Sequence, residues 1–211
     1  MASDIKMIMG KIAELFIILI LVSVVLNVSS PFIKFAIKLY SFQSLMLAFY
    51  ILMGAVHFNS INLYGSFAIT IIFKVILIPY FLFKTLKKVK MDKEINMYIG
   101  IPEAVVFAGS LTLLSNLIAQ KIVKTGITFG SFVFTISLAT FLIGAMLMIT
   151  RKTLFSQILG FLTIDNAIFL AANSITHGMP LLVELGVLFD LFVSILILSL
   201  LILNLRRNVA S

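Results

Sequence analysis

Three ionisable residues, Lys74, Asp165 and Asp190, stand inside long apolar runs of the sequence. An ionisable side chain deep in a bilayer costs at least a few kcal/mol, which makes each of them a functional candidate by default. With the helices predicted below and a rise of about 1.5 Å per residue, each lies about 15–17 Å into its helix. That depth is close to the midplane of a hydrocarbon core about 30 Å thick. Carboxylates and a lysine at one height suit lateral proton movement between neighbouring groups.

The same charges also allow a purely structural interpretation. Lys74 would pair with one carboxylate and hold two helices together. The second carboxylate would then lack a partner, and a buried carboxyl group without a partner favours its neutral, protonated form. Because a proton relay needs that same form, the two interpretations both remain open.

His177 and Glu184 lie at the turn that precedes the last predicted helix and in its first turns. Together they would form a proton entry or exit at the outer surface, since histidine titrates near neutral pH. The alternative is an interfacial charge that contacts lipid headgroups and water.

The composition excludes a soluble globule. Of the 211 residues, 62% are hydrophobic and 11% are charged, and the mean hydropathy is +1.21. A soluble domain is about half apolar and a quarter charged. The solvent must therefore be lipid.

Charge and residue types exclude further classes. The net charge of +8 does not indicate nucleic-acid binding, because the basic residues fall between apolar runs and not along one face. The absence of Cys excludes disulfides, thiolate metal sites and iron–sulfur ligation. The two histidines, His57 and His177, cannot assemble a metal-ligand cluster, so we expect no cofactor.

Apolar runs and their breaks predict an all-α, polytopic membrane protein with about seven transmembrane helices. The first apolar stretch continues to Leu26 without a small-residue cleavage site before Pro31, so we expect a retained helix and not a signal peptide. Pro79 should kink the end of the third helix. The predicted helices lie within residues 15–33 and at 40–58, 63–83, 102–120, 127–149, 154–175 and 180–205.

The basic residues orient this layout. Seven helices place eleven Lys and Arg side chains on one side and four on the other, while Lys74 lies in the membrane and completes the sixteen. By the positive-inside rule the N-terminus is outside and the C-terminus is in the cytoplasm. We therefore expect a multi-pass protein of the cell (inner or plasma) membrane. The eleven are Lys34, Lys38, Lys84, Lys87, Lys88, Lys90, Lys93, Arg151, Lys152, Arg206 and Arg207, and the four are Lys6, Lys11, Lys121 and Lys124.

The last two predicted helices carry a motif. Residues 160–172 read GFLTIDNAIFLAA and residues 177–190 read HGMPLLVELGVLFD. This pattern of a Gly, an acidic-Asn pair, Gly-x-Pro and Glu-Leu-Gly-x-x-x-Asp resembles the hydrogenase-4 component E family. That family provides a small membrane subunit of group 4 nickel–iron hydrogenase and formate hydrogenlyase-type complexes. Its last three helices are similar to subunit K of respiratory complex I.

The resemblance implies a membrane-arm subunit that contributes to assembly and to lateral proton or cation translocation. Asp165 and Asp190 would stand on the helices that carry the intramembrane glutamates of subunit K. The chain differs from the family in having Asp165 before Asn166 where Glu is usual. The partners would be other membrane subunits and the bilayer, and the chain alone would have no redox activity. Residues 1–126 would form a four-helix region, and 127–211 the three-helix region that resembles subunit K.

Two other functions stay open. A stand-alone small transporter would often show inverted repeats and broken helices, and the sequence shows neither clearly. An inert membrane scaffold is the other. The partner enzyme, the electron donor, the coupled ion and the direction of transport do not follow from the sequence.

Overall fold

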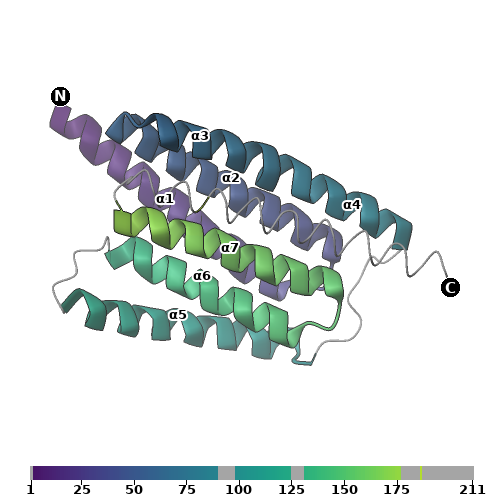
Figure 1. The fold of residues 1–211 in the computed structure, drawn as a ribbon. Helices are drawn as coiled ribbons and strands as arrows, with labels where there is room; N and C mark the ends of the chain where they lie inside the picture. Colours follow the sequence, from purple (N-terminus) through teal and green to yellow (C-terminus); the bar gives the residue numbers. More distant parts are fainter. Residues whose placement is uncertain (1, 90–97, 125–130, 177–185, 187–211) are drawn as a thin grey trace.

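A computed structural model describes residues 2–89, 98–124, 131–176 and 186. All the elements in these residues are helices, which confirms the all-α prediction for this part of the chain (Figure 1). They are α1 (Ala2–Ser29), α2 (Ile33–Phe58), α3 (Ile61–Ile69), the π-helix η1 (Thr70–Leu77), α4 (Ile78–Val89), α5 (Ile101–Lys124), α6 (Ser131–Thr150) and α7 (Leu154–Thr176).

Six helical segments in the described residues are long and apolar enough to cross a membrane. They agree in order and approximate position with the first six predicted helices. The seventh, at 180–205, lies outside the described residues except for Gly186, and the orientation of the termini stays a prediction. The six segments are Met9–Ser29, Ile33–Phe58, Ile61–Lys87, Ile101–Ile122, Ser131–Thr150 and Leu154–Ala172.

The ends of α2 show how the charged termini join the apolar spans. The helix begins at Ile33, earlier than the predicted residue 40. Its first turns therefore contain Lys34 and Lys38, whose side chains are both exposed. Lysine stems lie along a helix while their ammonium groups reach the polar interface. At the other end Asn59 adopts a left-handed conformation with φ 48°, and its N–H bonds to the Ala55 carbonyl. Asparagine is one of the few residues that end a helix in this way.

The helices form one bundle. α3, η1 and α4 follow one another without a break and run beside α2 (Figure 1). α1 packs on α2, α5 and α6, while α7 packs on α6 and α2. Helices of the predicted region 1–126 are therefore in direct contact with helices of the predicted region 127–211.

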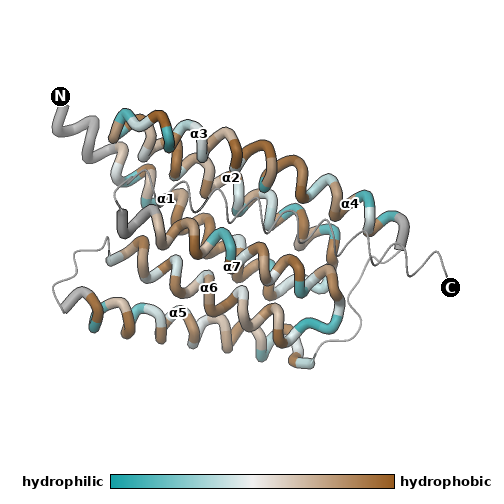
Figure 2. The backbone as a smooth tube through the Cα atoms, viewed as in Figure 1, coloured by the Kyte–Doolittle hydropathy of each residue, from teal (hydrophilic) through white to brown (hydrophobic). Residues whose placement is uncertain are grey.

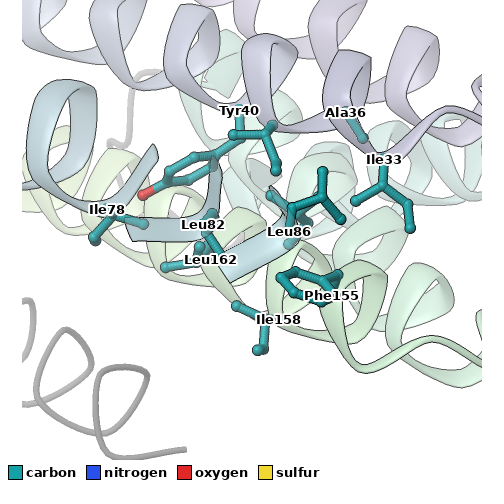
Figure 3. Packing of buried hydrophobic residues seen from close by; sticks show 11 residues of the cluster. Ile33, Ala36, Tyr40, Ile78, Leu82, Leu86, Phe155, Ile158 and Leu162 are labelled. Atoms are coloured by element: carbon teal, nitrogen blue, oxygen red, sulfur yellow. The ribbon is translucent and has the colours of Figure 1, made fainter. Parts of the chain in front are cut away.

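Side chains from α2, α4 and α7 meet in a buried apolar cluster. Figure 3 shows Tyr40 of α2 lying toward Ile78 and Leu82 of α4, with Leu162 and Phe155 of α7 across from them. This cluster fixes α7 against α2 and α4 on one side of the bundle. Large apolar side chains are also exposed on the outside, as expected of a surface in contact with lipid. Figure 2 shows that apolar residues recur along the described helices.

α6 and α7 approach each other closely at Gly144 and Gly160. A Cβ atom built on Gly160 would lie 2.9 Å from the Gly144 carbonyl oxygen, and one on Gly144 would lie 3.0 Å from the Gly160 carbonyl oxygen. Small residues at a membrane helix interface let the backbones approach in this way.

Candidate functional site: a buried lysine–aspartate pair

Lys74 lies within the π-helix, an irregularity that sequence reasoning missed. The Ile78 N–H bonds to the Phe73 carbonyl five residues earlier. The next donor of this ladder would be residue 79, but Pro79 has no N–H, so the π-helix ends there. The π-helix lies on the N-terminal side of Pro79, and the predicted kink itself stays a prediction. π-Helical turns are rare and frequently lie at functional sites.

The neighbouring helix compensates for part of what Pro79 removes. An N–H at position 79 would bond to the Val75 carbonyl in an α-helix, and proline cannot supply it. The Ser41 Oγ of α2 donates to that carbonyl oxygen at 3.0 Å. This contact ties η1 to α2 next to Lys74.

Lys74 forms a buried ion pair with Asp165 of α7. The Lys74 Nζ lies 2.7 Å from the Asp165 Oδ2, and each side chain is only 2% exposed. The same ammonium donates to the Asn166 Oδ1 at 3.1 Å and lies 5.4 Å from the centre of the Phe169 ring. Asp165 and Asn166 lie near the middle of α7, between apolar residues.

Asn166 connects the pair to α2. Its Nδ2 donates to the Ser44 Oγ at 3.1 Å, and both side chains are buried. With its amide nitrogen used in this way, Asn166 presents its carbonyl oxygen to Lys74. The cluster therefore holds side chains of three segments, α2, η1 and α7, in one hydrogen-bonded network.

Some polar atoms near the middle of the helices have no hydrogen-bond partner among the described residues. They include the Asp165 Oδ1, the Gln43 Nε2 of α2 and the Thr140 Oγ1 of α6. Buried polar groups are normally satisfied by protein or by ordered water, so these atoms mark places where a polar ligand would be favourable. Gln43 was not predicted as a site residue, although a glutamine in the charge-free run 39–73 was a usable signal.

The structure brings two of the five predicted site residues together, Lys74 and Asp165. Asp190, Glu184 and His177 lie outside the described residues and stay predictions. Gly186, the one described residue of the last predicted helix, lies against the site, because a Cβ atom there would be 3.0 Å from the Phe169 ring.

The chemistry available to the pair is proton exchange. An ammonium N–H points at a carboxylate oxygen over a distance that a proton crosses directly, in a place without competing bulk water. Within the described part of the chain, no three His, Asp or Glu side chains come together as the ligands of a metal ion would.

The comparisons with known proteins give one relative. The chain is 27% identical over 174 residues to the uncharacterized protein Rv0085 of Mycobacterium tuberculosis, and the match covers 81% of this chain and 78% of the relative. No family model and no solved structure matches the chain. The similarity supports a shared layout over most of both chains and carries no activity with it.

Proposed function

We propose that the chain is a membrane-arm subunit of a hydrogenase-type or complex I-like redox complex, where it contributes to assembly and to lateral proton or cation translocation. The observation that carries this proposal is the buried Lys74–Asp165 pair near the middle of a bundle of apolar helices. The motif of residues 160–190, which contains Asp165, supports the same assignment.

Burying the Lys74–Asp165 ion pair is energetically unfavourable. Removing two charges from water costs several kcal/mol per ion, and their attraction repays this only when geometry and hydrogen bonding are good. An apolar pair of the same volume is often as stable or more stable. A buried pair of this kind therefore favours a role beyond adhesion, and a proton-transfer site is the role that its chemistry fits.

In the proposed path, protons pass laterally through the membrane arm at the height of Lys74 and Asp165. Asp190 is the next carboxylate of this path, and His177 with Glu184 connects it to the outer surface. The redox centres belong to partner subunits, so this chain alone has no redox activity. The complex lies in the cell membrane.

A structural scaffold is the second candidate, and one observation favours it. The pair and Asn166 join η1, α7 and α2, which is what a stabilising contact between helices would do. The two candidates differ in what happens when the proton-carrying group is lost but its shape is kept.

The test is Asp165→Asn in the intact complex, isolated through a tag on this chain and reconstituted in vesicles. An amide keeps the shape of the carboxyl group but cannot release a proton, so we expect proton translocation to fall at least tenfold while the subunit content is unchanged. Glu103→Gln is the matched control, because Glu103 is an exposed carboxylate in the first turn of α5. Full coupling in an Asp165→Asn, Asp190→Asn double variant would refute the proton path. Loss of the complex itself would favour the scaffold.

A further inference from the structure

The groups around the Lys74 ammonium form a cradle for a monovalent cation. A carboxylate oxygen of Asp165 lies at 2.7 Å, an amide oxygen of Asn166 at 3.1 Å and the face of the Phe169 ring at 5.4 Å. Carboxylate and amide oxygens are ligands of hard metal cations, and an aromatic face attracts any cation. These groups would therefore attract a cation even without the lysine.

The cradle is set in place by contacts that do not involve the ammonium. Ser44 holds the amide nitrogen of Asn166, which turns the carbonyl oxygen of Asn166 inward. The Asp165 Oδ1 is buried and has no hydrogen-bond partner among the described residues, so the carboxylate has a second oxygen to offer. The site thus presents more oxygen ligands than the ammonium contact uses.

We infer that Lys74 is the resident cation of this cradle, and that it excludes Na⁺ and leaves the proton as the ion that the site exchanges. A Na⁺ ion bound to Asp165 would lie about 4 Å from the ammonium. At an effective dielectric constant of about 20, the repulsion between two unit charges at that distance lowers the affinity roughly a thousandfold. As an assignment of the coupled ion, this inference rests on the proposed function.

Proton transfer within the pair does not open the site to Na⁺. When the proton moves, an N–H bond of Lys74 breaks, its electron pair stays on the nitrogen, and an O–H bond forms on Asp165. The ion pair and the neutral pair both have zero net charge, so the transfer itself adds no negative charge that would attract Na⁺. A neutral carboxylic acid is also a poor ligand for a metal ion.

Removal of the lysine should convert the proton site into a sodium site. Lys74→Ala leaves Asp165, the amide oxygen and a space that water and Na⁺ can share. In alkaline buffer Na⁺ competes with the proton that the carboxyl group would otherwise hold once the lysine is gone. Lys74→Met is the matched control, because it also removes the charge but fills the space with a side chain of similar length. Adding Asp165→Asn to Lys74→Ala removes the carboxylate and should abolish the site.

The experiment measures binding of radioactive sodium to the full-length chain in detergent, by equilibrium dialysis in mildly alkaline buffer with choline chloride as the balancing salt. We expect no saturable binding by the natural chain or by Lys74→Met. We expect saturable binding by Lys74→Ala, at least about a hundredfold tighter than any residual binding by the natural chain. Saturable binding by the natural chain would overturn the inference, as would a folded Lys74→Ala variant that binds no sodium.

If Lys74→Ala folds poorly, its recovery from membranes is compared in NaCl and in choline chloride. Recovery in NaCl alone supports a sodium site, and equal failure in both salts counts against it. The outcome is separate from that of the proposed function. If the natural chain excludes Na⁺ and the Asp165→Asn, Asp190→Asn variant stays fully coupled, the inference about the cradle holds and the proton path is refuted. If the natural chain binds sodium and Asp165→Asn loses coupling, the inference about the cradle is refuted and the proton path stands.

Discussion

A single methyl group added at Gly160 should weaken the bundle, and the structure gives the size of the effect. The new Cβ atom would lie 2.9 Å from the Gly144 carbonyl oxygen and 2.9 Å from both the backbone nitrogen and the Cγ of Met148. Carbon contacts are ordinarily about 3.5–4.0 Å, so α6 and α7 must separate by about 0.5 Å. A gap of that size forfeits about a quarter of the dispersion energy of the contacts it opens.

Overpacking of this kind costs about 1–3 kcal/mol. We expect Gly160→Ala to lie in the upper half of that range, because two of the three close atoms are backbone and cannot rotate away. Gly65→Ala is the matched control, since a Cβ on Gly65 of α3 meets nothing within 4 Å. Both changes gain the same helix propensity of up to about 1 kcal/mol, so the difference between them isolates the clash.

The assay is unfolding in mixed micelles with increasing SDS, followed by far-UV circular dichroism. Gly144→Ala meets the same interface, with the Gly160 carbonyl at 3.0 Å, so the double variant should lose less than the two single losses combined. The first methyl already separates the helices and makes room for the second. Equal stability of Gly160→Ala and Gly65→Ala would show that α6 and α7 do not approach as described.

Three further outcomes follow from particular contacts. Ser41→Ala should cost about 0.6–1 kcal/mol, in keeping with hydrogen bonds between membrane helices, and should cost less in a Pro79→Ala background that restores a backbone donor, measured by the same unfolding titration. Arg151 is buried and donates to a carbonyl in the last turn of α1 at 2.6 Å, so Arg151→Met should lower the unfolding free energy by about 1.5–3 kcal/mol. Reporter fusions should read as external at His177 and as cytoplasmic after Arg207, and a cytoplasmic signal at His177 would refute the seven-helix topology.

Much of the fold followed from the length of the apolar runs, because lipid permits few alternatives to a helix. The order and approximate positions of the first six helices were predicted in this way, while the membrane depth of Lys74 and Asp165 stays a prediction. Helix ends were less predictable. Lys34 and Lys38 stand in the first turns of α2, because a helix continues past the hydrocarbon wherever long basic side chains reach the interface.

The details of the site depend on contacts that the sequence pattern does not express. Pairing of Lys74 with a carboxylate was foreseen as one of two interpretations, but not which carboxylate or that Asn166 and Ser44 would join it. The π-helix around Lys74 was missed, although Pro79 five residues later was its signal. The contact of Gly144 with Gly160 was missed because single glycines sixteen residues apart form no motif along either helix.

The two main contacts of α7 lie on opposite sides of that helix. At 3.6 residues per turn, Asp165 and Phe169 are about 140° and 180° around the axis from Gly160. The glycine contact therefore fixes the distance of α7 from α6, while the ion pair faces η1 and α2. Helix adhesion by itself does not require a buried charge, since the glycine face and the apolar cluster with α2 and α4 supply it without removing an ion from water. This division of roles favours a proton-exchange role for Lys74 and Asp165, and it predicts that the bundle survives the loss of both charges together, in a Lys74→Met, Asp165→Asn double variant, better than it survives Gly160→Ala.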